Sequence, residues 1–279
     1  MSAERNSILC PNCRKLISLD EASCPYCGLV RPGLHDTAGK LRGILFAFGP
    51  VQTILYINIA FYILSLLLDP RGIFMGVSPL GFLSPSDRSL FLLGGTGTFP
   101  VLHYHRLWTL LSASFLHGGI LHIVFNMMAL YQLGPFVLRE FGIHRFVNLY
   151  VLTGVAGFAV SILAGVHFTI GASASVCGLI GAIIYYGKSR GGYYGNAIFK
   201  QAIGWVVGLI LFGFIFSGIN NWAHGGGLLA GLALAYLTGY NDLKQESAWS
   251  KMLSYACIIV TAAVLIWAVG SSVYLRLLA

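Results

Sequence analysis

The sequence predicts an all-α polytopic membrane protein in which a small zinc ribbon precedes seven transmembrane helices. Of its 279 residues, 57% are hydrophobic and only 9% are charged, and the mean hydropathy is +0.78. In ordinary soluble domains about a quarter of the residues are charged. Four of the six cysteines lie in two closely spaced pairs near the N-terminus, and these pairs predict the ribbon.

The cysteine-rich segment 1–30 is the first predicted element. It contains Cys10-Pro-Asn-Cys13 and Cys24-Pro-Tyr-Cys27, two tight turns separated by ten residues. A structural zinc site needs four thiolates at tetrahedral corners, which two such turns supply. A disulfide pair is the alternative, but the topology derived below places the segment in the reducing cytosol. We therefore expect all four cysteines to bind one structural zinc ion, with a linker over 31–47.

The spans follow from five long windows that contain no Asp, Glu, Lys or Arg. A spanning helix needs roughly 20 apolar residues, so the windows 146–187 and 201–241 are each long enough for two helices. Polar, glycine-containing stretches interrupt both windows. The seven predicted spans are 48–68, 115–137, 147–165, 171–187, 200–217, 222–240 and 253–275. The first six form a predicted core over 48–240, and 241–279 holds a loop and the seventh helix.

The segment 70–105 follows the first span and interleaves apolar residues with Gly, Pro and Ser. Gly94-Gly95 and Pro100 interrupt its apolar stretch. We therefore expect an interfacial loop that dips into the outer leaflet rather than a further span.

The distribution of basic residues predicts the orientation through the positive-inside rule. With a cytoplasmic N-terminus, thirteen Lys and Arg residues fall on the inner side and four on the outer side. The inner residues are Arg5, Arg14, Lys15, Arg31, Lys40, Arg42, Arg139, Arg145, Lys188, Arg190, Lys200, Lys244 and Lys251, and the outer ones are Arg71, Arg88, Arg106 and Arg276. We expect a multi-pass protein of the inner or plasma membrane with its C-terminus outside. The net charge of +8 then requires no nucleic-acid partner.

Three polar clusters lie within this apolar sequence, where polar residues are rare and usually functional. The first runs from His117 through His122 to Asn126, and the last two of these residues share one helix face because they are four apart. The second is Gly171-Ala-Ser173-Ala, and the third is 220–227, which contains His224. The predicted spans that carry these clusters all run from outside to inside, so the clusters are expected at one depth near the outer face.

A serine, a histidine and further amide or imidazole donors at one depth are the parts of a nucleophilic hydrolase. Each part alone has a plainer explanation, such as a serine bonded to its own helix or a histidine that bridges two helices. No Asp or Glu lies in any span. This absence favours a Ser-His dyad over a triad, and it disfavours proton-coupled transport and aspartic proteolysis. The sequence also lacks the His-Glu-x-x-His motif of zinc proteases.

The ordered motifs His122-xxx-Asn126, Gly171-x-Ser173 and Ala223-His224-x-Gly-Gly resemble those of the rhomboid intramembrane serine proteases, over about 48–240. The resemblance implies a six-helix core, with Ser173 as nucleophile, His224 as general base, and His122 and Asn126 as oxyanion-hole donors. It also implies supporting roles for Gly171 and His117. The implied substrates are single-span membrane proteins, cut in the bilayer without a cofactor.

The chain departs from the family pattern at three places. Ala174 stands where the family usually has Gly, and Cys177 stands where an aromatic residue usually packs on the catalytic histidine. Trp108-Thr109 replaces a common Trp-Arg pair, for which Arg106 is a candidate substitute. Every catalytic residue type is nevertheless present. The main alternative is a catalytically inactive rhomboid-like protein that binds or escorts membrane proteins, and a partner of the zinc ribbon in the cytosol is also expected.

Overall fold

The computed structural model describes residues 7–10, 15–26, 32, 49–70, 73, 82–216, 218–243 and 245–277. The chain divides into two compact units, Met1–Gly49 and Pro50–Ala279. The predicted boundaries at 30 and 47 remain predictions, because most residues of 27–48 lie outside the described part of the chain.

The N-terminal unit contains a small antiparallel hairpin. Strand β1 (Ser7–Leu9) pairs with β2 (Leu16–Ser18), and Ile8 lies opposite Ile17. Cys10 follows β1 directly and is buried together with Ile17 and Cys24 in one small cluster. The hairpin therefore brings one cysteine from each predicted turn into the same place. Cys13 and Cys27, the other two predicted ligands, lie outside the described residues.

The C-terminal unit is helical, and within its described residues each of the seven predicted spans has one long helix. These are α2 (Pro50–Leu68), α5 (Ile120–Phe141), α6 (Ile143–Leu163), α7 (Ser173–Arg190), α8 (Gly192–Ile215), α9 (Asn221–Thr238) and α10 (Ala248–Leu277). Five of them, α2, α5, α6, α8 and α10, are long and apolar enough to cross a membrane. The other two, α7 and α9, are rich in Gly, Ala and polar residues, and α7 is mostly buried among the other helices.

Several predicted boundaries need correction, and the largest difference is at α8, which begins at Gly192 rather than at 200. The second span was expected from 115, but Ala113–Phe115 forms a short 3-10 helix and α5 begins only at Ile120, after Gly118 and Gly119. The expected loop 70–105 holds no spanning helix among its described residues, yet it is partly helical. It contains α3 (Asp87–Leu92) and the π-helical turn η2 (Phe99–His103). Two short helices within the loop satisfy backbone groups that an irregular loop would leave to solvent.

Arg106 anchors this loop. Its guanidinium donates to the carbonyl oxygens of Phe91 (2.7 Å) and Leu92 (3.0 Å) at the end of α3. It also lies over the rings of Phe91 and Trp108, 4.5 and 4.6 Å from their centroids. A planar cation with several donors suits such a helix end, where carbonyls lack partners. Arg106 thus provides the polar anchor expected of it.

Polar contacts also fasten the chain before α10 to the turn between α5 and α6. The Glu246 carboxylate accepts from the backbone N–H groups of His144 (2.9 Å) and Arg145 (3.1 Å) at the start of α6. The buried Arg145 side chain donates to Gln245 O (2.9 Å) and Asn241 Oδ1 (3.3 Å). A carboxylate at a helix N-terminus is stabilised by the free N–H groups there. These bonds hold the beginning of α10 against α6.

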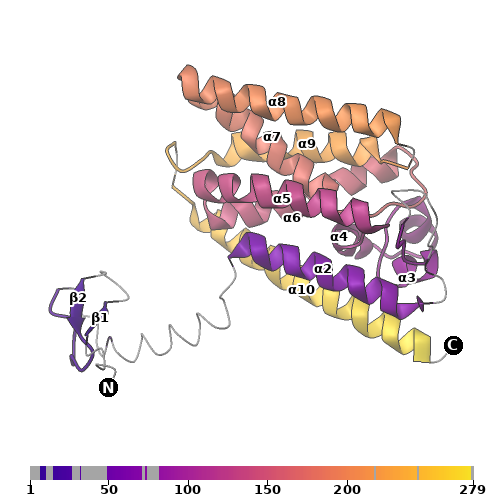
Figure 1. Ribbon diagram of the computed structural model, residues 1–279, viewed down its shortest axis with the longest axis horizontal. Coiled ribbons are helices and arrows are strands. Elements are labelled where there is room, and N and C mark those ends of the chain that lie inside the picture. The colour runs from indigo at the N-terminus through magenta and orange to yellow at the C-terminus, as the bar shows by residue number, and fades with distance from the viewer. Residues whose placement is uncertain are drawn as a thin grey trace. The chain divides into compact units, whose positions relative to one another are not determined.

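Helix α7 lies inside the bundle, in contact with α5, α6, α8 and α9 (Figure 1). Its closest approach is to α9, where small residues let the backbones meet. A Cβ atom added to Gly231 would lie 2.0 Å from Gly178 O, and one added to Gly227 would lie 2.1 Å from Ala174 O. Small residues on these two helices therefore pack directly on each other.

Alanine substitution should lower the thermal stability of the protein at a closely packed glycine of α9 and not at an unpacked one. Gly231→Ala would force the two backbones apart, a change of the kind that typically costs about 1–3 kcal/mol. Gly225 is the matched control, because nothing lies within 4 Å of its added Cβ, and alanine is favoured over glycine within a helix. Thermal unfolding in detergent should show a clear fall in Tm for Gly231→Ala and an unchanged or raised Tm for Gly225→Ala. Equal Tm values would contradict the close packing.

Candidate active site

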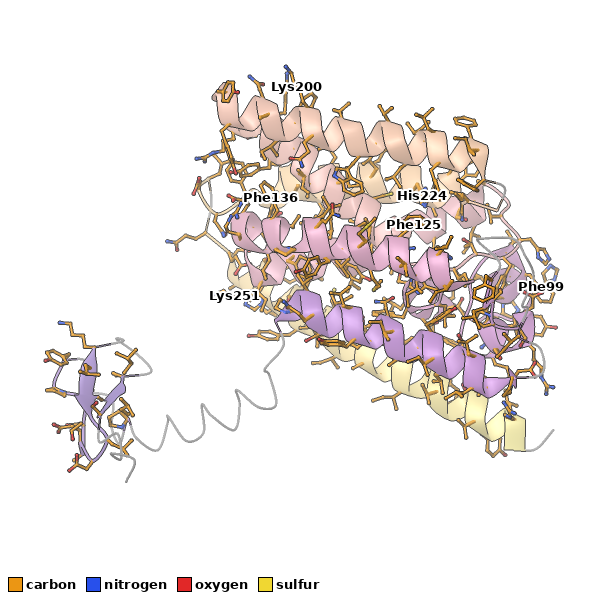
Figure 2. All side chains as sticks on the ribbon, in the orientation of Figure 1. Phe99, Phe125, Phe136, Lys200, His224 and Lys251 are labelled. Carbon is orange, nitrogen blue, oxygen red and sulfur yellow. The ribbon has the colours of Figure 1, made fainter. Side chains whose placement is uncertain are left out.

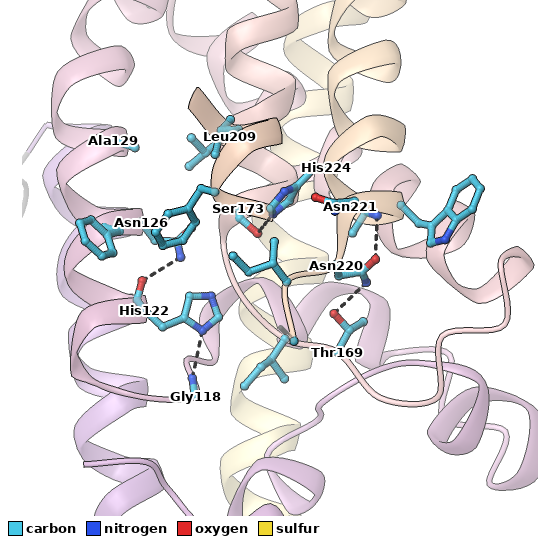
Figure 3. Close-up of a pocket in the computed structure, with 18 of the residues that line it drawn as sticks. Gly118, His122, Asn126, Ala129, Thr169, Ser173, Leu209, Asn220, Asn221 and His224 are labelled. Atoms are coloured by element: carbon cyan, nitrogen blue, oxygen red, sulfur yellow. Dashed lines mark hydrogen bonds between the residues drawn. The ribbon is translucent and has the colours of Figure 1, made fainter. Parts of the chain in front are cut away.

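The three polar clusters meet in one cavity at the end of the helices where α5, α7 and α9 begin. The cavity has a volume of about 1090 Å³. Its lining includes His122, Asn126, Ser173, Asn220 and His224, which come from these three helices and from the chain just before α9 (Figure 3). Apolar side chains of α5 and α8 form much of the remaining wall.

Ser173 and His224 lie side by side in this cavity. His224 Nε2 and Ser173 Oγ are 2.8 Å apart, within hydrogen-bonding distance (Figure 3). Ser173 is the first residue of α7, and the chain turns into the helix at Gly171, whose φ of +124° is rarely adopted by other residues. His224 lies in the first turn of α9. The starts of two helices thus place a hydroxyl beside an imidazole.

Asn220 fixes the start of α9. Its Oδ1 accepts from the backbone N–H of Ala223 (3.0 Å), which is the usual work of an N-cap residue. Its Nδ2 donates to Ser161 Oγ (2.6 Å) on α6 and to Thr169 Oγ1 (2.9 Å) before α7. One amide therefore ties α9 to α6 and to the loop that leads into Ser173 at the start of α7. The sequence placed Asn220 in the third cluster, but only the structure gives it this positioning role.

His122 presents a ring nitrogen to Ser173. Its Nδ1 accepts from the backbone N–H of Gly118 at 3.3 Å. A neutral imidazole whose Nδ1 accepts carries its proton on Nε2. A Cβ atom added to Gly171 would lie 2.7 Å from His122 Nε2 and 3.7 Å from Ser173 Oγ. The absence of a side chain at Gly171 thus keeps the space between the donor and the hydroxyl open.

Asn126 lies one helical turn after His122, on the same face of α5. Its Nδ2 donates to His122 O at 2.9 Å, and the side chain lines the cavity. Because an amide NH₂ carries two hydrogens, the second remains for another acceptor. The cavity thus contains two groups that can donate to an oxygen near Ser173.

His117, a predicted supporting residue, and Cys177, a departure from the family pattern, both lie buried near the site. The buried His117 ring packs edge-on against the ring of His122, with centroids 5.1 Å apart. Neither His117 nitrogen has a hydrogen-bond partner within the described part of the chain, so its contact with the site is one of packing. Cys177 is buried on α7, one turn after Ser173, and adds no polar group to the cavity lining.

His224 Nδ1 is buried, and no described protein group hydrogen-bonds to it. Asp87 of α3 also lines the cavity, but no bond joins it to His224 among the described residues. Within the described part of the chain, no carboxylate orients His224 as it would in a Ser-His-Asp triad.

The wall formed by α8 was not expected from the sequence. Gln201, Trp205 and Phe212 of α8 line the cavity, and the rings of Phe125 on α5 and Phe212 meet edge to face at 5.6 Å. Residues 200–217 gave no signal for this role, because an apolar helix that faces lipid and one that faces a cavity have the same composition.

Comparison with known proteins identifies this part of the chain. Residues 104–241 match the rhomboid domain family. The chain contains a rhomboid domain. The match covers all three clusters of the cavity, and with the five apolar helices it makes the chain a multi-pass integral membrane protein.

Several relatives share this similarity. The chain is 30% identical to rhomboid protease GluP of Bacillus subtilis over 226 residues, which cover 81% of this chain and 42% of the relative. It is 28% identical to RHOMBOID-like protein 1 of Arabidopsis thaliana, with 67% and 52% covered, and 30% identical to Rhomboid-like protease 5 of Toxoplasma gondii, with 58% and 20% covered. The matched region thus spans about half or less of each of these relatives.

Proposed function

We propose that this protein is an intramembrane serine endopeptidase that cleaves the transmembrane segments of single-span membrane proteins with a Ser173–His224 dyad. The observation that carries the proposal is the 2.8 Å contact between Ser173 Oγ and His224 Nε2 inside a cavity lined by the rhomboid domain's apolar helices. A hydroxyl is a weak nucleophile by itself and needs such an adjacent base.

In the proposed mechanism, His224 Nε2 takes the hydroxyl proton as Ser173 Oγ attacks the scissile carbonyl carbon. The carbonyl oxygen becomes an oxyanion, which accepts hydrogen bonds from His122 Nε2–H and the free Asn126 N–H. His224 then gives its proton to the leaving amine, and an acyl group remains on Ser173. Water, deprotonated by His224, attacks this ester, and the returning proton restores the hydroxyl.

A reconstitution experiment tests the proposed activity. Purified protein in liposomes is mixed with a single-span substrate that carries a tag at each end, and the products are analysed by mass spectrometry. We expect one cut within or beside the membrane segment. Binding of the substrate without any cut would instead favour the inactive escort protein.

We also propose the orientation and the metal. The excess of Lys and Arg on one side supports a cytoplasmic N-terminus. We propose that α7 and α9 are the remaining two of seven spans, which places the C-terminus outside, and that the membrane is an inner or plasma membrane. Burial of Cys10 and Cys24 in one cluster fits a zinc site completed by Cys13 and Cys27. Within the described residues no group of three metal-binding side chains gathers, and those residues include only two of these four cysteines.

The ribbon should be separable from proteolysis, because its zinc would stabilise only its own small fold. Cys10→Ser combined with Cys13→Ser should abolish bound zinc, measured by elemental analysis, and leave cleavage of a model substrate in detergent unchanged. A protein that begins at Ala38 should cleave equally well. Full retention of zinc by the double variant would contradict the ligand assignment, and loss of cleavage in both variants would show that ribbon and site are coupled.

A further inference from the structure

Two glutamines lie on facing helices deeper in the membrane than the candidate active site. Gln132 of α5 and Gln201 of α8 both line a second, smaller cavity of about 120 Å³, whose other lining residues, such as Leu133, Phe136 and Trp205, are apolar or aromatic. Gln201 and Trp205 also line the large cavity that contains Ser173. The two cavities are therefore neighbours along the seam between α5 and α8.

Both glutamine side chains are exposed at the surface of the helical bundle. Neither the Gln132 nor the Gln201 side chain makes a hydrogen bond with any residue that the structure describes. In hydrocarbon an unsatisfied amide is costly, and polar side chains inside a bilayer usually serve a function. The amides differ in this from Asn58, Asn148 and Asn220, which all donate to neighbouring helices or to their own.

The depth of Gln132, and with it that of the small cavity it shares with Gln201, follows from helix geometry. Gln132 follows Asn126 by six residues, about 9 Å along α5 at 1.5 Å per residue. Figure 2 shows the same direction along α5, where Phe125, which lines the cavity of His224, is followed by Phe136 toward the C-terminal end of the helix. A bound chain that continues from the scissile bond along this seam covers about 9 Å with three extended residues or six helical ones.

We propose that Gln132 and Gln201 form a specificity subsite that binds an amide or hydroxyl side chain of the substrate's transmembrane segment, three to six residues deeper than the scissile bond. This inference rests on the proposed proteolysis. Each glutamine offers one carbonyl acceptor and two N–H donors, and together they complement a substrate Asn, Gln, Ser or Thr. The polar side chain of such a residue has no hydrogen-bond partner in lipid. Its transfer to the cavity between α5 and α8 gives hydrogen-bond partners both to this side chain and to the glutamine amides.

The chemistry of the subsite predicts a preference at one substrate position. An apolar residue at that position leaves both glutamines unpaired, whereas a polar residue pairs with them. The gain is expected to be about three- to tenfold in cleavage rate, the effect of one interhelical hydrogen bond in a membrane.

The test combines a substrate scan with glutamine variants. Single-span substrates carry either Asn or Leu at each of the third to sixth positions beyond the cut, and each is cleaved by wild type, Gln132→Met, Gln201→Met and the double variant. We expect wild type to prefer Asn at one position by about three- to tenfold, and the double variant to lose this preference. Tyr131→Met is the matched control, because Tyr131 neighbours Gln132 but lines neither cavity.

Two further readouts keep the outcomes distinct. Each variant should still react with a fluorophosphonate at Ser173, and its own rate on the Leu substrates is the baseline from which its preference for Asn is calculated. Wild-type cleavage without preference at any scanned position, or a preference that survives in the double variant, would overturn the subsite alone. If wild type neither reacts nor cleaves, the proposed proteolysis fails and the subsite with it.

Discussion

Replacement of Ser173 by Ala, of His224 by Ala, and of both together is expected to reduce proteolysis to the same residual rate. The two side chains are 2.8 Å apart and act as one unit, since the hydroxyl needs the imidazole to take its proton. When a nucleophile and its base act together, loss of either costs nearly as much as loss of both. Cleavage of a model transmembrane substrate in detergent, followed on gels, measures the three rates.

Ser175→Ala provides the matched control for this experiment. Ser175 is a fully buried serine of α7, two residues after Ser173, but it does not line the cavity and its hydroxyl has no partner within the described residues. We expect it to cleave at the wild-type rate. Wild-type turnover by Ser173→Ala would remove the serine from the mechanism.

Loss of either oxyanion donor is expected to lower kcat by about 10²–10³, the usual effect of removing one such hydrogen bond. His122→Ala removes the Nε2–H that faces Ser173, and Asn126→Ala removes the free amide hydrogen. Because these bonds strengthen as charge develops on the oxygen, kcat should fall while KM changes little.

Steady-state kinetics with a fluorogenic membrane substrate distinguishes these parameters. His103→Ala is a control, since His103 is exposed and does not line the cavity. Unchanged kcat in both variants would mean that backbone N–H groups alone hold the oxyanion. A rise in KM at constant kcat would assign His122 and Asn126 to substrate binding.

The residues of the candidate site were visible in the sequence because polar groups stand out in an apolar chain. The spacing of His122 and Asn126 places both residues on one face of α5. Ser173 and His224 lie in the first turns of α7 and α9, the helices predicted to contain them. Their short mutual distance was not derivable from spacing alone, since it depends on the backbone contact between α7 and α9. That contact needs glycine at Gly227 and Gly231, where an added Cβ atom would meet the backbone of α7.

Other features depend on tertiary contacts that cannot be predicted from the local amino-acid sequence. Asn220 has three partners on three segments, and only the fold shows which of several asparagines is the N-cap. The predicted start of α5 is five residues too early. Gly118 and Gly119 contain no charge and so extend the uncharged window, but the helix begins only after them. The sequence does not predict the cavity wall on α8 either, because side chains that face lipid and side chains that face an apolar cavity have the same hydropathy.

Covalent labelling with a fluorophosphonate tests the central claim most directly, since only an activated serine reacts at an appreciable rate. Wild-type protein and the Ser173→Ala and His224→Ala variants are treated in detergent, and the adduct is located by peptide mass spectrometry. We predict one adduct, on Ser173 of the wild type, and none on either variant. An unlabelled wild type, or equal labelling of the His224→Ala variant, would contradict the Ser173–His224 dyad.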